Sequence, residues 1–285
     1  MQQRYWRWIG VFVALTLLLL AGASLNTFRH WEGVAATIET PAERRAKLAP
    51  FWRMVPPAIP VAQAEAMLLS GCDGVHDNLD YWAGVLEGRG HPGLIIDSHT
   101  PRGLDKLQSW RLLCMGQVLP GAQRAGDLAV AMAASQQDDV ILLGASHGGW
   151  SVLEFLGQVQ TGTLPPGLTA WPAPPESLYS RVGATIVFYP YCGMLNGADR
   201  GDWSDAPPIL MILGEKDELR LTPACRKMAA DLRARGADIE LIVYTEAGHG
   251  FEQQERAPLS QLTFLPAHRA DATRQVEDFL SRHGL

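Results

Sequence analysis

The sequence predicts an α/β fold with a mostly parallel central sheet, helices on both faces, and a hydrophobic helix in front of it. Within residues 63–285, short apolar runs alternate with amphipathic stretches, the pattern of repeated strand–helix–strand units. These runs are almost continuously hydrophobic, which is typical of strands buried on both faces. The length of 285 residues and the 47% hydrophobic content suit one substantial domain with a core.

The expected elements follow from apolar runs and from helix-ending residues. The expected strands span residues 66–69, 93–97, 140–144, 184–189, 209–213 and 240–244. The expected helices span residues 78–89, 121–135, 223–235 and 268–282, with another directly after residue 146. Gly90 and Gly236 are typical stop signals for two of them. Residues 161–180 are rich in proline and interrupt the alternation, so either a loop over a pocket or a plain surface excursion fits them.

Charge and composition exclude two broad classes of protein. The formal net charge is -6, and no basic stripe is available to neutralise phosphates, so we expect no nucleic-acid binding. The apolar content is too high for a disordered chain.

The N-terminus has the pattern of an exported protein. Arg4 and Arg7 precede an uncharged apolar run at residues 9–25, which is near the lower limit for a membrane-spanning helix. Small residues at 21–23 would also suit a signal peptidase. We therefore expect residues 1–28 to be a signal anchor or signal peptide, and the remainder to be periplasmic or secreted. If the segment is not cleaved, it attaches the protein to the membrane.

The expected boundaries place a tether and leading helix at residues 29–62, with the helical stretch around residues 42–52, and the main domain at residues 63–285. The chain has four cysteines, Cys72, Cys114, Cys192 and Cys225, an even number that permits disulfides in an exported protein. Their spacing is not that of a zinc site, so we expect no metal.

The segment at residues 140–149 indicates nucleophilic catalysis. A buried strand runs into Gly-x-Ser-x-Gly at residues 144–148 and then into a helix. A catalytic serine needs such a sharp strand-to-helix turn, and its small neighbours let the backbone pack closely. The motif alone occurs by chance, but its place between strand and helix makes Ser146 the candidate nucleophile.

A serine hydroxyl becomes a nucleophile only when a base removes its proton and an acid orients that base. Later in the chain, one expected strand ends in a loop with Asp217, and the next ends in a loop with His249 between two glycines. The order serine, acid, histidine is the one this arrangement requires. Asp217 and His249 are therefore the expected acid and base, with Glu215 or Glu218 as alternatives to Asp217.

The oxyanion formed during acyl transfer needs backbone N–H donors. We expect one from His147, directly after the nucleophile, and one from Cys72, in a glycine-containing loop after an early strand. A nucleophilic role for Cys72 is the alternative, but the sequence places no base beside it.

The chain resembles the dienelactone hydrolase family of the α/β-hydrolase fold from about residue 66 to the C-terminus. The ordered motifs are Ser-Gly-Cys-Asp-Gly at 70–74, Asp-Ser at 97–98, Pro-Arg-Gly at 101–103, the serine motif, Tyr-Pro-Tyr-Cys-Gly at 189–193, Gly-Glu-Lys-Asp at 214–217 and Gly-His-Gly-Phe at 248–251. The resemblance implies Ser146, Asp217 and His249 as a triad that needs no cofactor.

Two residues depart from the family pattern. The founding members use a cysteine nucleophile where this chain has Ser146, which moves the expected chemistry towards general ester or amide hydrolysis. The oxyanion loop commonly opens with His-Gly, and here it opens with Ser70 and Gly71.

The expected topology narrows the cysteine pairing. Cys72, Cys192 and Cys225 should all lie at the carboxyl edge of the sheet, so our hypothesis is Cys192–Cys225 and Cys72–Cys114. Separate buried cysteines remain the alternative. At the same edge, we expect Asp97 and Arg102 to form a structural ion pair.

The expected function is hydrolysis of an ester, or of an amide or lactone, in a small acyl substrate through an acyl-enzyme intermediate. An acyltransferase would use the same triad with another acceptor than water. A different class, a non-catalytic membrane-anchored binding protein on the same fold, is the second alternative.

Overall fold

The computed structural model describes residues 2–256, 260 and 262–285. Its centre is a seven-stranded sheet with the order β1-β3-β2-β4-β5-β6-β7. The strands are β1 (Trp52–Val55), β2 (Ala66–Leu69), β3 (Gly93–Ile96), β4 (Val140–Ala145), β5 (Val182–Phe188), β6 (Ile209–Gly214) and β7 (Ile239–Tyr244). All neighbouring pairs are parallel except β1 with β3. The predicted mostly parallel sheet is thus confirmed.

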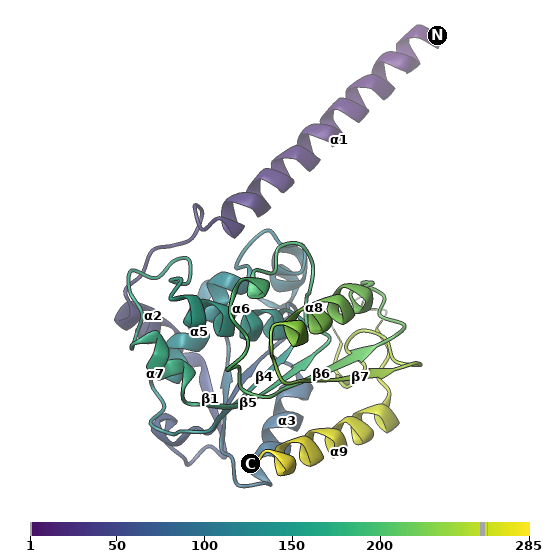
Figure 1. Cartoon of the computed structure of the whole chain (residues 1–285). Helices are drawn as coiled ribbons and strands as arrows, with labels where there is room; N and C mark the ends of the chain where they lie inside the picture. The colour runs from purple at the N-terminus through teal and green to yellow at the C-terminus, as the bar shows by residue number, and fades with distance from the viewer. Residues whose placement is uncertain (1, 257–259, 261) are drawn as a thin grey trace.

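Helices cover both faces of this sheet. Figure 1 shows α3 (Asp77–Glu87) and α9 (Pro266–Arg282) on one side, and α5 (Gly121–Met132), α6 (His147–Thr161) and α8 (Thr222–Ala234) on the other. The shorter helices are α2 (Pro41–Leu48), α4 (Lys106–Gln108), which continues as a π-helix over Ser109–Leu113, and α7 (Pro175–Tyr179). Strands β2, β3 and β4 are buried along their whole length, as their continuous apolar runs predict.

The edge strand β1 is a feature that the sequence did not reveal. The helix expected at residues 42–52 ends earlier, because α2 stops at Leu48 and a 3-10 turn follows. Residues 52–55 then pair with β3 in a segment we expected to be tether and leading helix. Within β1 only Met54 is buried, while Arg53 is exposed. An alternation of buried and exposed residues over four positions is too short to distinguish a strand from the end of a helix in the sequence.

The proline-rich segment lies against α5 and the N-terminal part of the body. Leu168 is buried, and it forms a bridge with Glu39. A Cβ built on Gly126 of α5 would lie 3.2 Å from the side chains of both Leu168 and Pro165. These contacts are those of a surface excursion that packs on α5 and on the segment around Glu39. The same proline-rich segment also forms the short helix α7.

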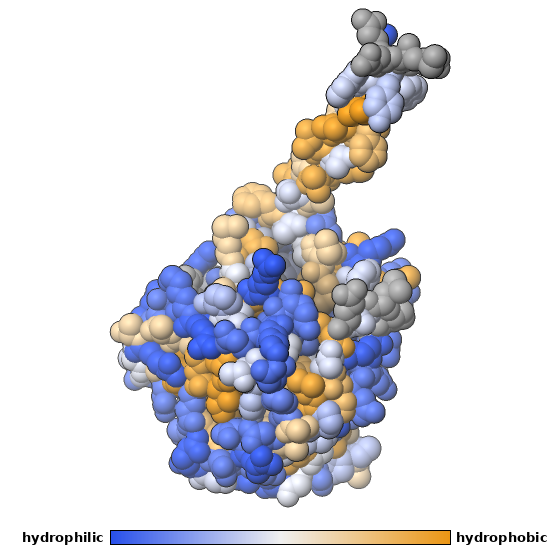
Figure 2. All heavy atoms as spheres, turned by 90° about the vertical axis from the view of Figure 1, so that its right-hand side faces the viewer, coloured by the Kyte–Doolittle hydropathy of each residue, from blue (hydrophilic) through white to orange (hydrophobic). Residues whose placement is uncertain are grey.

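The helix α1 (Gln2–Trp31) leaves the body and projects away from it (Figure 1). Within it, Tyr5–Trp31 is long and apolar enough to cross a membrane, and none of its most apolar window is buried. Figure 2 shows that hydrophobic side chains run along this helix and continue onto the adjoining surface of the body. Together with two disulfides, such a helix points to a location outside the cytoplasm.

Candidate active site

Ser146 lies at the sharp turn between β4 and α6. Its backbone has φ 52° and ψ -114°, a conformation that an L-residue adopts only at a cost of about 1–3 kcal/mol. The strand before the turn is fully buried, and α6 begins at the next residue. The turn therefore holds the serine at the carboxyl edge of the sheet, as the motif predicted.

The glycines of the serine motif make this turn possible. A Cβ on Gly144 would lie 2.5 Å from the backbone of Gly148, and a Cβ on Gly148 would lie 2.2 Å from the carbonyl oxygen of Leu69. Both contacts are with backbone atoms that cannot move aside. The start of α6 thus packs directly on the end of β2, and only glycine fits there.

His249 joins Ser146 to Asp217 by hydrogen-bonding distances. Its Nε2 atom is 2.8 Å from Ser146 Oγ, and its Nδ1 atom is 2.9 Å from Asp217 Oδ2. Both the histidine and the aspartate are buried. The other Asp217 oxygen accepts a hydrogen bond from the backbone N–H of Leu219, which fixes the carboxylate in its loop. The three side chains predicted as a triad lie together, although they come from loops after β4, β6 and β7.

The two alternative acids have other contacts. Glu215 pairs with Arg226 at the surface. Glu218 accepts the backbone N–H of His249 at 2.8 Å, so it positions the histidine loop rather than the imidazole ring. A Cβ on Gly248 would lie 2.5 Å from the Glu218 carboxylate, so a side chain at this position would displace that carboxylate from the backbone N–H of His249.

The loop after β2 lies against Ser146. A Cβ built on Gly71 would be 3.7 Å from Ser146 Cβ. The next residue, Cys72, forms a disulfide with Cys114, with Cα atoms 5.0 Å apart. The predicted pairing is confirmed, and Cys72 is not a free thiol. Its backbone N–H and that of His147 are the expected oxyanion donors, a role that stays a prediction.

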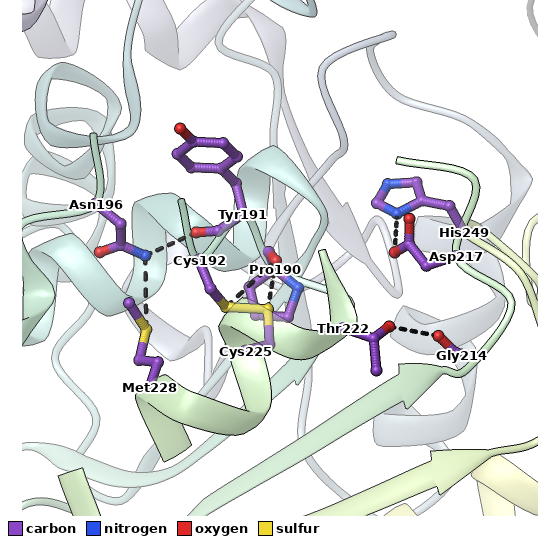
Figure 3. The surroundings of a disulfide bond; sticks show 10 residues. All are labelled: Pro190, Tyr191, Cys192, Asn196, Gly214, Asp217, Thr222, Cys225, Met228 and His249. Atoms are coloured by element: carbon purple, nitrogen blue, oxygen red, sulfur yellow. Dashed lines mark hydrogen bonds and ion pairs between the residues drawn. A yellow bond between two sulfur atoms is a disulfide. The ribbon is translucent and has the colours of Figure 1, made fainter. Parts of the chain in front are cut away.

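The second disulfide, Cys192–Cys225, is also the predicted one. It ties the loop after β5 to the start of α8, on the same side of the domain as the Asp217–His249 pair (Figure 3). Thr222 donates its hydroxyl proton to the carbonyl of Gly214, which joins α8 to the end of β6. The loop with Asp217 is therefore held at both of its ends.

Arg124 is a buried residue of the site that sequence reasoning missed. It comes from α5, and its guanidinium donates to Ser70 O at 2.7 Å, to Ser70 Oγ at 3.0 Å and to Ser98 Oγ at 3.1 Å. Burial lowers its pKa to about 10, so it stays charged at neutral pH. Burial and the nearby Arg124 charge also hold the pKa of the His147 ring well below its usual range. An arginine in an otherwise small-residue helix was the available signal.

Glu252 and Tyr189 form a second buried group behind His249. The Tyr189 and His249 rings lie 4.5 Å apart, and the Tyr189 hydroxyl donates to Glu252. Asn78 and Trp82 also donate to this carboxylate. Burial raises the pKa of Glu252 and outweighs these hydrogen bonds. The sequence showed Glu252 only as one acid in a loop.

The expected ion pair between Asp97 and Arg102 is not formed. Asp97 accepts hydrogen bonds from the backbone N–H groups of His99 and Thr100, so it caps the turn after β3. Arg102 instead pairs with Asp127 of α5 at 2.8 Å. Asp127 is buried and lies on helix α5. It is 25 residues from Arg102 in the sequence, so proximity along the chain did not reveal it as the partner.

A cavity of about 450 Å³ opens beside the oxyanion loop. It is lined by Asp73, Gly74 and Val75 and by the chain between residues 97 and 109. Asp73 links the cavity to the loop of Gly71, which lies against Ser146, but Ser146, Asp217 and His249 are not among its lining residues.

Comparison with known proteins agrees with this fold. Residues 170–284 match the family model described as "Dienelactone hydrolase family". A protein assigned as a dienelactone hydrolase from Klebsiella pneumoniae subsp. pneumoniae MGH 78578 has a similar structure, with a TM-score of 0.55 and 17% identity over 77% of this chain and 85% of that one. No curated protein sequence gives a significant match.

A thermophilic esterase from Thermogutta terrifontis, Est2, is similarly related, with a TM-score of 0.56 and 15% identity over 79% of this chain and 84% of that one. Its propionate-bound structure has a TM-score of 0.55 and 15% identity over 79% and 86% of the two chains. At such identities the structures show a shared fold, and the family match concerns residues 170–284 alone. Residues 170–284 of this chain thus match the dienelactone hydrolase family, and the chain as a whole shares the α/β fold of these structures.

Proposed function

We propose that this protein is a serine esterase in which Ser146 is the nucleophile, His249 the base and Asp217 the residue that orients it. The observation that carries the proposal is the unbroken path from Asp217 Oδ2 through both ring nitrogens of His249 to Ser146 Oγ, at 2.9 and 2.8 Å. Distances of this length allow a proton to move from the serine to the histidine as the hydroxyl attacks.

The reaction proceeds in two balanced halves. Ser146 Oγ bonds to the ester carbonyl carbon, its proton passes to His249 Nε2, and the carbonyl electrons form an oxyanion facing the N–H groups of Cys72 and His147. The oxyanion collapses, and the alcohol leaves with the proton from His249. Water then attacks the acyl-enzyme and gives a proton to His249, which returns it to Ser146 as the carboxylic acid departs.

The acyl group is expected to be small. The loop after β2 lines a cavity of about 450 Å³, within the ordinary size for a small-molecule pocket. The similar Thermogutta terrifontis esterase is described in a propionate-bound form. Short-chain esters are therefore the first substrates to test.

The test uses the full chain in detergent, with a fluorophosphonate probe and a short nitrophenyl ester. Wild type should be labelled and should turn over the ester, and Ser146→Ala should lose both while it keeps its fold. A matched variant, Ser151→Ala, removes a serine hydroxyl that bonds to the carbonyl of His147 on the same helix, and it should still be labelled. If the folded wild-type protein is not labelled by the fluorophosphonate probe, the proposal is wrong, and the non-catalytic binding protein becomes the favoured alternative.

A further inference from the structure

The last turn of α1 is docked on the loops around the candidate site. The Asn26 side chain donates to the carbonyl of Gln117 at 2.8 Å, and the Gln117 amide donates to the Thr27 hydroxyl at 2.8 Å. The Trp31 indole donates to the carbonyl of Leu195 at 3.1 Å. Residues 117 and 195 each lie three positions after a disulfide-bonded cysteine, so α1 joins both braced loops.

This docking leaves no spacer between a membrane and the body. The apolar run at residues 9–25 is about 25 Å long at 1.5 Å per residue, close to the thickness of a bilayer's hydrocarbon core. Asn26 follows the run directly. If α1 is retained as an anchor, the loop that Asn26 contacts lies at the level of the lipid headgroups.

The chain at residues 106–115, here called the interfacial segment, exposes apolar side chains beside this contact. The exposed fractions are 62% for Leu107, 42% for Trp110 and 69% for Met115. Lys106 and Arg111, on the same segment, are also exposed. Exposed apolar residues with a tryptophan and flanking basic residues are typical of helices that lie in a membrane interface.

The other side of the interfacial segment faces the candidate site. Lys106 and Ser109 line the cavity of about 450 Å³ next to the oxyanion loop. Cys114, at the end of the segment, is bonded to Cys72 of that loop. The segment is thus linked on one side to the loops that hold α1 and on the other to the loop that lies against Ser146.

We infer that the interfacial segment lies in the headgroup layer of the bilayer that holds α1, and that the cavity receives its acyl substrate from that layer. The occupant of this apolar surface is lipid, because the hydrogen bonds at Gln117 place the interfacial segment directly beside the apolar helix α1. The exposed Arg111 favours anionic headgroups there. The membrane contact stands without the proposed esterase activity, whereas the substrate route depends on it.

The membrane contact is tested by photo-crosslinking of the full chain in nanodiscs that contain anionic lipid. Benzoylphenylalanine replaces Leu107, Trp110 or Met115 in turn, with Asp138 as the control position. Asp138 is exposed just before β4, at the sheet edge opposite Ser146. Lipid adducts should form at the three segment positions and not at residue 138, whether or not the protein is active.

Adducts of equal yield at all four positions would overturn the contact. So would crosslinks in native membranes that go to another protein instead of lipid. A purified chain whose intact mass lacks α1 would overturn it as well.

The substrate route is tested with the variant Leu107→Asp/Met115→Asp in the same nanodiscs. Hydrolysis of a water-soluble nitrophenyl ester should stay unchanged, while hydrolysis of a lipid-anchored ester should fall roughly tenfold, which corresponds to about 1.4 kcal/mol. The conservative variant Leu107→Phe/Met115→Leu should keep both rates. An equal loss on both esters, or no loss on either, would contradict the route; absence of all hydrolysis in wild type would instead sink the proposed esterase function.

Discussion

Arg124 offers a sharp test of how the fold supports the site. Its guanidinium is completely buried and donates to Ser70 O, Ser70 Oγ and Ser98 Oγ. We expect Arg124→Met to destabilise the protein and to slow catalysis, because Ser70 begins the loop that carries Cys72, the proposed oxyanion donor. Ser98→Ala is the matched control, since it removes one of the acceptors and leaves both bonds to Ser70.

The magnitude follows from two opposing effects. Hydrogen bonds to a charged group contribute about 1.5–3 kcal/mol each, so loss of the three bonds costs roughly 4–9 kcal/mol. Burial lowers the pKa of Arg124 from 12.5 to about 10. At about 1.4 kcal/mol per pKa unit, the variant is relieved of roughly 3 kcal/mol of charge burial. The bonds outweigh this relief, and the net loss should be about 1–6 kcal/mol.

Denaturant unfolding followed by tryptophan fluorescence measures the stability, and turnover of a short nitrophenyl ester measures catalysis. Arg124→Met should lower kcat about 100-fold, the size of effect expected when an oxyanion donor is displaced. Ser98→Ala should cost about 1.5–3 kcal/mol, the contribution of one such bond, and leave kcat nearly unchanged. If Arg124→Met unfolds within about 1 kcal/mol of wild type and keeps its kcat, the oxyanion loop does not depend on this arginine and our reasoning fails.

Asp217→Asn should lower kcat by about 10⁴-fold while the fold is kept, because the neutral amide no longer stabilises the charged imidazole of His249. A pre-steady-state assay that shows acylation at the wild-type rate would contradict this prediction. Replacing the Cys192–Cys225 pair by serines should cost about 4 kcal/mol, since the crosslink spans 33 residues, and unfolding with and without reductant checks it. The pKa of Glu252 is higher in the folded protein than its ordinary value of 4.5, so the folded state holds the proton more tightly than the unfolded state. The protonated side chain therefore contributes fully to the free energy of unfolding below pH 4.5, and this contribution is lost as the pH rises through the raised pKa. Glu252→Gln, which cannot ionise, should therefore flatten the decline of Tm above pH 4.5, and parallel Tm curves for the two proteins would argue against that account.

Local patterns in the sequence were enough to predict the parallel sheet and the chemical groups. Continuous apolar runs predicted the strands because a strand buried on both faces has no polar positions. The serine motif predicted the turn because glycine alone fits where α6 meets β2, as the 2.2 Å clash at Gly148 shows. The order of strand-end loops then predicted that Asp217 and His249 would meet Ser146, since parallel strands share one carboxyl edge. The same reasoning gave both disulfide pairs.

Contacts between distant and unremarkable positions were decided only by the tertiary structure. Strand β1 is four residues long, so its pairing with β3 depends on a neighbour that local pattern does not show. Arg102 bonds to Asp127 and not to Asp97, and Arg124 reaches Ser70, because α5 packs beside the loops after β2 and β3. The docking of Asn26 on Gln117 likewise joins segments that are 91 residues apart. A sequence specifies which side chains are suited to burial or bonding, but which of them meet depends on how the packed layers bring separate segments together.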